Sequence, residues 1–221
     1  MINERLMEIH RLLRERFGEL GWWPAQSGFE VAVGAILTQN TAWANVEKAI
    51  ANLKRAGILS APAINACPDE QLAEFIRPAG YFNIKTKRLK AFTRWLMNET
   101  GGEIELLKDR SLFSLREDLL AVKGIGRETA DSIILYALDK PTFVVDSYTA
   151  RIFIRHQLLD EYADYEQIKE FFEGALPQDT GFFNEFHALI VELGKNYCKK
   201  SRPKCTGCPL EHLPHRLDDD Y

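Results

Sequence analysis

Apolar residues recur every three to four positions along most of the chain, which is the period of an α-helix. Residues 6–17 show this pattern near the start, and residues 89–96 repeat it, each with its apolar side chains on one face. Residues 142–145, Thr-Phe-Val-Val, are the best candidate for a strand, but so short a run can equally be a buried connector. The pattern therefore predicts an all-α fold.

Stretches rich in glycine and proline separate the helical segments. Breaks are predicted at residues 21–28, 57–68, 101–102, 124–126 and 177–181. The segments between these breaks correspond to roughly nine or ten helices of ordinary length.

Composition narrows the class of protein. The chain has 221 residues, of which 46% are hydrophobic and 27% charged, as is typical of a globular protein with a sizeable core. No run of about 18 uncharged apolar residues occurs and the first residues are polar, so we expect neither a membrane span nor secretion. The formal net charge is −4. Any nucleic acid partner must therefore be held by local features rather than by a global positive field.

Charge is unevenly distributed along the chain. Residues 85–94 hold five basic side chains and no acidic one, and residues 195–204 repeat that balance. Residues 160–173, in contrast, hold six acidic residues and one lysine, and we expect them to face away from any polyanion. Each basic block can be a solvated helix face or a phosphate-binding surface, and the sequence alone leaves both interpretations open.

The stretch Lys123-Gly124-Ile125-Gly126-Arg127 predicts a tight turn between two helices. The two glycines permit a positive φ, and Ile125 between them is expected to anchor the turn in the core. The helix that follows would present unpaired N–H groups to a phosphate without reading base sequence. The alternative is a plain helix–turn–helix corner, because Gly-x-Gly alone is a weak signal.

Asp146 lies twenty residues after Gly126 and directly follows an apolar run. Burial there would hold its carboxylate rigidly, as a catalytic acid requires. The alternative is an N-cap, in which the carboxylate accepts hydrogen bonds from the first N–H groups of the next helix and contributes about 1 kcal/mol. The two roles are compatible.

With the hairpin and the aspartate together, the chain resembles the helix-hairpin-helix DNA glycosylase superfamily, the endonuclease III group. Three more segments resemble that family in the same order: Leu-Thr-Gln-Asn-Thr at 37–41, Gly-Tyr-Phe-Asn at 80–83, and residues 186–194. The resemblance implies two helical domains with the active-site cleft between them. We expect one domain at residues 29–146, containing the hairpin, and the other at residues 1–28 plus 147–221.

The resemblance also implies which residues hold DNA. The expected contacts are Lys123, Gly124, Ile125, Gly126 and Arg127 of the hairpin, with Lys85, Lys87 and Arg88 of the central loop. The expected partner is double-stranded DNA with a damaged base, bound by a monomeric, cytoplasmic and nucleoid-associated enzyme.

Glu128 indicates which chemistry the resemblance implies. Bifunctional relatives carry a lysine at this position, two residues after the last hairpin glycine, and its amine forms a Schiff base with the sugar. A carboxylate cannot form an imine, so we predict a monofunctional N-glycosylase in which Asp146 acts with water. The alternatives are an endonuclease III-like glycosylase and AP lyase for oxidised pyrimidines, and a non-catalytic DNA-binding module.

Tryptophans point to one branch of the superfamily. Trp22-Trp23-Pro24, with Trp43 soon after residues 37–41, resembles the 3-methyladenine DNA glycosylase III branch. A cationic alkylated base would be attracted to an indole face, and its charge makes it a good leaving group. The expected base pocket comprises Trp22, Trp23, Trp43, Gln39 and Glu128. The alternatives are core packing for the tryptophans, at least one of which should pack inward, and an exposed helix-start acid for Glu128.

The C-terminal cysteines form an incomplete metal loop. Cys198, Cys205 and Cys208 match the first three ligands of the iron–sulfur loop of the family, but the fourth position is Pro214. His212 or His215 could supply the missing ligand to a 4Fe–4S cluster or another metal, which the chemistry itself would not require. The alternative is a relic loop with free thiols. Cys67, far away in sequence, is expected to be a buried apolar residue.

Overall fold

The computed structural model describes residues 2–23 and 25–216, and in these residues it contains helices and no strand. Pro24 and the acidic tail from residue 217 onward lie outside the described residues. Contacts divide the chain into a terminal unit, Met1–Trp22 with Pro141–Tyr221, and a central unit, Trp23–Lys140. The sequence had suggested boundaries after residues 28 and 146. With the observed boundaries, Asp146 belongs to the terminal unit.

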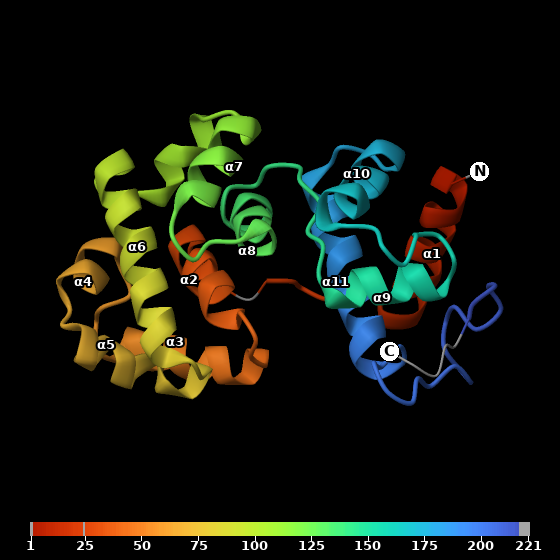
Figure 1. Ribbon diagram of the computed structural model, residues 1–221, viewed down its shortest axis with the longest axis horizontal. Coiled ribbons are helices and arrows are strands. Elements are labelled where there is room, and N and C mark those ends of the chain that lie inside the picture. Colours follow the sequence, from red (N-terminus) through yellow and green to blue (C-terminus); the bar gives the residue numbers. More distant parts are fainter. Residues whose placement is uncertain (1, 24, 217–221) are drawn as a thin grey trace. The chain divides into compact units, whose positions relative to one another are not determined.

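The central unit is built around α2 (Gly28–Thr38), in which every residue from Phe29 to Leu37 is buried. The other elements of this unit pack around it or against one another (Figure 1). They are α3 (Trp43–Arg55), α4 (Ala61–Ala66), α5 (Asp69–Ile76), η1 (Arg77–Ala79), α6 (Phe82–Thr100), η2 (Ile104–Asp109), α7 (Leu112–Ala121), α8 (Arg127–Ser132) and the π-helical turn η3 (Ile133–Ala137).

The terminal unit joins the two ends of the chain around a phenylalanine core. Its helices are α1 (Ile2–Phe17), α9 (Ser147–Arg155), α10 (Tyr165–Ala175) and α11 (Thr180–Asn196). Residues 142–145 are not a strand but a buried extended connector, and Phe143 stacks on Phe172 of α10 with ring centroids 4.1 Å apart. The connector interpretation is therefore correct. It places Asp146 at the start of α9.

The predicted break at residues 57–68 contains a helix, α4, that the hydrophobic pattern did not reveal. Ser60 caps its first turn by accepting a hydrogen bond from the N–H of Ala63, and Pro62 stands in that turn, where a missing N–H costs nothing. The proline therefore begins a helix here. Among the described residues, no helix is long and apolar enough to cross a membrane.

Candidate functional site

The predicted hairpin joins α7 to α8. Gly124 has φ of +92°, a conformation that favours glycine, and the side chain of Ile125 is only 5% exposed. The N–H of Ile125 donates to the carbonyl of Val122, which closes the turn. Gly126 differs from the expectation, because its φ of −96° and ψ of 179° are accessible to any residue. Only Gly124 therefore requires glycine for its backbone conformation.

Two side chains brace the hairpin from neighbouring helices. Gln39, at the end of α2, donates from Nε2 to the carbonyl of Gly124 at 3.2 Å and to Oγ1 of Thr129 at 2.9 Å. Arg88 of α6 donates to the side-chain carbonyl of Gln39 and covers Gly124 so closely that an added Cβ would overlap its Cγ. In this structure Gln39 and Arg88, predicted to contact the base and the DNA backbone, hold the turn in place.

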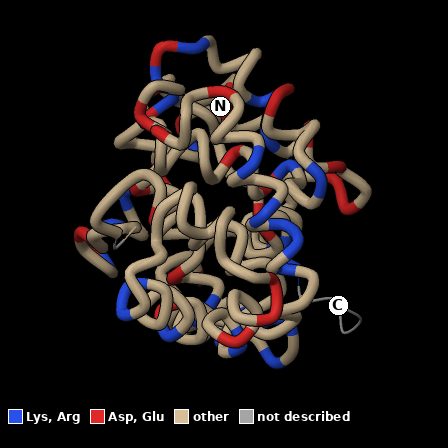
Figure 2. Tube along the Cα trace, turned by 90° about the vertical axis from the view of Figure 1, so that its left-hand side faces the viewer, with Lys and Arg blue, Asp and Glu red and all other residues tan. Residues whose placement is uncertain are grey.

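The basic residues predicted to contact DNA separate into exposed and buried groups. Lys123 and Arg127 on the hairpin and Lys87 on α6 are exposed. Figure 2 shows basic and acidic residues in many parts of the trace, and the formal net charge is −4. A positive contact surface on this protein is therefore a local one.

The prediction that Lys85 contacts DNA is wrong. Its side chain is 1% exposed, and its ammonium donates to the carbonyls of Leu37 and Ala79 at 2.7 and 2.8 Å. Burial, with a smaller contribution from Arg88, lowers its pKa to about 8. Lys85 shares the helical face of Leu89 and Phe92, so the periodicity that buries these residues also buries the lysine.

Asp146 caps α9, as predicted. Its Oδ1 accepts hydrogen bonds from the N–H and the Oγ1 of Thr149, at 2.7 and 2.9 Å. Its Oδ2 lies 3.6 Å from Nε2 of His187 on α11, and the side chain of Asp146 is 12% exposed. Burial by itself raises the pKa of Asp146, but the contacts with His187 and Thr149 outweigh burial, and the pKa lies below its ordinary value. The acid is therefore ionised at neutral pH.

The two adjacent tryptophans belong to different units. In the terminal unit, the ring of Trp22 lies edge-on to His187, with centroids 6.4 Å apart, and Nζ of Lys195 is 5.3 Å from its centroid. In the central unit, Trp23 packs against Trp43 and Tyr136, with centroids 4.8 and 5.1 Å away. Trp23 is thus the tryptophan that packs inward, as expected for at least one of the two. Trp22 lies beside His187, the partner of Asp146.

The remaining base-pocket candidates also lie in the central unit. Trp43 begins α3, and its Nε1 donates to Oε1 of Glu47 at 2.9 Å while its ring takes part in the Trp23 cluster. Glu128 is exposed in the first turn of α8, where a carboxylate is favoured by the helix dipole.

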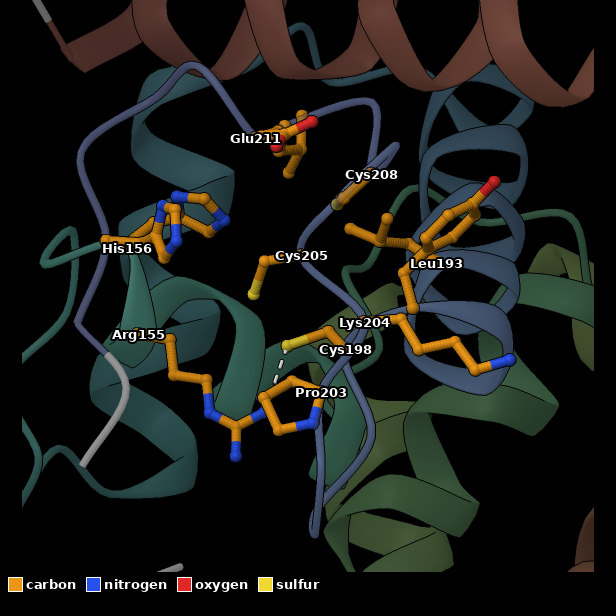
Figure 3. Close-up of a pocket in the computed structure, with 12 residues that line it drawn as sticks. Arg155, His156, Leu193, Cys198, Pro203, Lys204, Cys205, Cys208 and Glu211 are labelled. Atoms are coloured by element: carbon orange, nitrogen blue, oxygen red, sulfur yellow. Dashed lines mark hydrogen bonds between the residues drawn. The ribbon is translucent and has the colours of Figure 1, made fainter. Parts of the chain in front are cut away.

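The three C-terminal cysteines line one pocket that is open to solvent. Figure 3 shows Cys198 and Cys205 turned into it, with Arg155 donating to Sγ of Cys198 at 3.3 Å. Burial raises the pKa of the Cys205 and Cys208 thiols. Within residues 2–23 and 25–216, no group of three or more histidine, cysteine or acidic side chains is arranged to hold a metal ion. The donors are therefore spread around the pocket.

The histidine alternatives differ in position. His215 lines the cysteine pocket, whereas His212 is exposed and does not. Nδ1 of His215 bonds to the carbonyl of Leu213 at 2.9 Å, so its Nε2 keeps the lone pair that a metal would use. His156, which sequence reasoning missed, lines the same pocket, and its Nδ1 bonds to the carbonyl of Pro214 at 3.0 Å. Cys67 is buried, as predicted.

Sequence reasoning missed two further residues at this site. His187 was only part of the segment 186–194, although a histidine within the otherwise apolar run 186–191 was a usable signal. Arg155 holds the cysteine loop by donating to the carbonyls of Lys199 and Lys200 at 2.7 and 2.9 Å. No local pattern distinguishes Arg155 from a surface arginine, because its partners lie more than 40 residues away.

Comparisons with known proteins agree with this architecture. Residues 33–178 match the HhH-GPD superfamily base excision DNA repair proteins. A Methanocaldococcus jannaschii protein named as a candidate DNA repair glycosylase is 47% identical over 211 residues, covering 95% of this chain and 96% of its own.

Two solved structures extend the comparison. The 3-methyladenine DNA glycosylase MagIII of Helicobacter pylori, bound to 1,N6-ethenoadenine, is 31% identical with a TM-score of 0.75, over 88% of this chain and 97% of its own. An endonuclease III–DNA complex shares the fold, with a TM-score of 0.83 at 21% identity, over 96% of this chain and 94% of its own. With its hairpin and its capping aspartate, the chain belongs to the HhH-GPD superfamily and is a DNA glycosylase of base excision repair.

Proposed function

We propose that this glycosylase excises an alkylated base of the 3-methyladenine type from duplex DNA by hydrolysis, with Asp146 as its catalytic residue. The observation that carries the proposal is the state of Asp146, an ionised carboxylate fixed at a helix start between Thr149 and His187. An acid held in one charged state and one orientation suits a reaction that develops positive charge on the sugar.

Asp146 would act on the sugar of an everted nucleotide. As the bond between C1′ and the base nitrogen breaks, its electron pair passes to the base and neutralises the charge that alkylation had placed there. Water adds to C1′ and gives its proton to the carboxylate, which also stabilises the cationic sugar. Because the base leaves as a neutral molecule, the reaction requires no dedicated general acid.

Trp22 is the stacking residue of this proposal. It lies in the same unit as Asp146 and beside His187, and an indole face attracts a cationic base by about 2 kcal/mol when water is excluded. Trp23 is less suited, because Trp43 and Tyr136 already pack against its ring. The 1,N6-ethenoadenine bound to the Helicobacter pylori relative supports a site for modified purines.

The hairpin would hold the DNA backbone. Lys123 and Arg127 are exposed beside the turn, and Gln39 and Arg88 keep the turn rigid from behind. Contacts of this kind position the strand without reading bases and weaken as salt rises. Glu128 offers no amine for a Schiff base, so the proposed enzyme has no AP lyase activity through that position.

We also propose that the cysteine pocket holds a polynuclear iron–sulfur cluster through Cys198, Cys205, Cys208 and His215. The donors are three cysteine thiols and one imidazole that line a single pocket, and binding of the cluster would deprotonate the thiols. Such a cluster supplies no step of the reaction and fixes the loop that carries Lys199 and Lys200.

Base release from methylated DNA tests the catalytic proposal. The wild type should free 3-methyladenine from DNA treated with a methylating agent, and Asp146→Asn should lose this activity by about a hundredfold or more while binding the same DNA. The matched control is Asp164→Asn, which removes the N-cap carboxylate of α10, and it should leave the release rate unchanged.

The alternatives give different outcomes in the same assay. Borohydride should trap no covalent adduct on abasic DNA, whereas a trapped adduct would establish an endonuclease III-like lyase. Release of oxidised pyrimidines in place of methylated purines would overturn the proposed substrate. A wild type that frees no base from any damaged duplex would be a DNA-binding module.

Iron and sulfide content of anaerobically purified protein tests the cluster. The wild type should carry both and absorb visible light, and His215→Ala should lose much of each, whereas His212→Ala should not. His215→Cys should retain the cluster with a changed spectrum. Wild-type protein that lacks iron and sulfide after reconstitution would establish the relic loop.

A further inference from the structure

The two carboxylate oxygens of Asp146 contact different groups of the terminal unit. Oδ1 is committed to the start of α9, where it accepts both hydrogen bonds from Thr149. Oδ2 faces α11, where Nε2 of His187 lies 3.6 Å away. The helix cap therefore fixes one oxygen, and the other oxygen faces His187.

His187 is built into the core of the terminal unit and not onto its surface. It is 5% exposed in the middle of α11, among a run of buried residues from Phe186 to Val191. The two helices approach closely because Tyr148 of α9 packs directly on Gly194 of α11, where any Cβ would overlap its ring. The position of the imidazole relative to Asp146 is therefore set by backbone packing.

We propose that His187 is the positioning residue of Asp146: its imidazole holds Oδ2 in the orientation and charge state that base release requires. This inference rests on the proposed catalytic role of Asp146. Burial of its side chain opposes the ionisation of Asp146, and two neighbours counter that cost, Thr149 at Oδ1 and His187 at Oδ2. A histidine beside a buried acid can donate its N–H to the carboxylate and oppose that cost, and such hydrogen bonds are often long before substrate binds.

The other charged or titratable groups around this pair are engaged elsewhere. On α9, Arg151 donates to the carbonyls of Ser147 and Cys198. On α10, the hydroxyl of Tyr165 accepts from the N–H of Val145, and on α11, Lys195 lies over Trp22. On the α1 side of α11, Glu185 bonds to His10 and Arg14. His187, in contrast, places its Nε2 3.6 Å from Oδ2 of Asp146.

The physical consequence is a defined pH dependence. Base release needs the carboxylate form of Asp146, so the rate falls as pH drops through its pKa. The contact with His187 is a main cause of the lowered pKa, so we expect its removal to raise the pKa of Asp146. The acid limb of the rate profile should then move to higher pH, and each pKa unit of movement costs about tenfold in rate at pH values below the limb.

The test is single-turnover release of 3-methyladenine from methylated DNA across the pH range from about 3 to 8, which spans the acid limb of a carboxylate. His187→Ala should move the acid limb upward by at least one unit, and His187→Gln, which keeps an N–H donor, should restore part of the difference. Affinity for undamaged DNA should not change in either variant. Unfolding by urea separates loss of structure from loss of positioning.

The terminal unit offers a matched control in His10. It is also buried, and its Nε2 bonds to a carboxylate, Oε2 of Glu185, at 2.8 Å. His10→Gln should lower the free energy of unfolding as much as His187→Gln does, yet leave the acid limb where it is. A limb that moves equally in both variants would overturn the inference, because the cause would then be general destabilisation.

Failure of this inference differs from failure of the proposed function. If Asp146→Asn releases base normally, the proposed catalytic role of Asp146 is wrong, and the acid limb of the rate profile belongs to another group. If release depends on Asp146 but His187→Ala keeps the wild-type limb and rate, Asp146 is catalytic and His187 is only a core residue.

Discussion

Trp22 and Trp23 are adjacent in the sequence, yet they belong to two units that surround the indole ring with different groups. Around Trp23, the central unit supplies Trp43, Tyr136 and the bare backbone of Gly34, so the ring is one member of a packed cluster. Around Trp22, the terminal unit supplies polar groups, the imidazole of His187 and the ammonium of Lys195. Trp23 therefore packs among other aromatic rings, whereas Trp22 lies beside an imidazole and an ammonium.

The same contrast extends to the rest of each region. In the central unit, Gln39 and Arg88 fix the hairpin and Lys85 ties α2 to η1, so its polar side chains serve structure. In the terminal unit, Asp146 caps α9 through Oδ1, while its Oδ2 lies beside the imidazole of His187. We therefore expect substitutions in the central unit to change stability, and substitutions near Trp22 to change catalysis.

The largest expected effect tests the packed indole. Trp23→Ala should lower the free energy of unfolding by about 3–5 kcal/mol, because Trp43 and Tyr136 lose their partner and a cavity remains. Urea unfolding measures this loss. Trp22→Ala serves as the comparison and should cost clearly less, and equal losses would mean that the two regions do not differ as described.

The next effect is the pH dependence that buried Lys85 imposes. Its pKa is lowered from 10.5 to about 8, so between these values the unfolded chain binds a proton that the folded protein does not, and stability rises with pH. At about 1.4 kcal/mol per pKa unit, the full rise is about 3 kcal/mol.

A variant comparison isolates this contribution. The free energy of unfolding of the wild type, minus that of Lys85→Met, should grow steadily from pH 8 to pH 10.5. Lys87→Met, at an exposed neighbouring position, should show no such growth. If the difference in free energy of unfolding between the wild type and Lys85→Met does not change with pH, the ammonium of Lys85 stays charged in the folded protein.

The hairpin glycines give a smaller effect with an internal control. Gly124→Ala should cost about 2 kcal/mol, because φ is +92° and the new Cβ overlaps Arg88. Gly126→Ala should change stability by less than about 0.5 kcal/mol, because its backbone is extended and no atom lies within 4 Å of the new Cβ. Adding Arg88→Ala to Gly124→Ala should recover part of the loss, and if it recovers none, the strain lies wholly in the backbone.

The order of helices and the buried hairpin residue could be predicted from the sequence because both follow from short-range periodicity. Lys85 shows the limit of that reasoning. Counting charges in residues 85–94 predicted a DNA contact, although the helical period of the same residues already pointed Lys85 inward. Where composition and periodicity disagree, periodicity decides, since it reports which face a side chain occupies.

The pairing at the candidate site could not be predicted in the same way. Asp146 and His187 are 41 positions apart, and their contact depends on the approach of two helices, which the close packing at Gly194 allows. Likewise, nothing in the dipeptide Trp22-Trp23 indicates that a unit boundary separates its members. Long-range contacts of this kind follow from packing of whole elements, which no local window of sequence contains.

The effect of Trp22 on the rate of base release is the sharpest test of the contrast between the two indoles. Trp22→Ala should slow release of cationic 3-methyladenine by about thirtyfold, which corresponds to the loss of about 2 kcal/mol of attraction between the base and the indole. Trp22→Phe keeps a weaker aromatic face and should give an intermediate rate. Affinity for a duplex with an abasic site, which offers no base to stack, should stay at the wild-type value in both variants. If Trp22→Ala instead releases base at the wild-type rate, Trp22 does not stack on the base. The stacking residue would then belong to the central unit, contrary to the roles proposed for the two tryptophans.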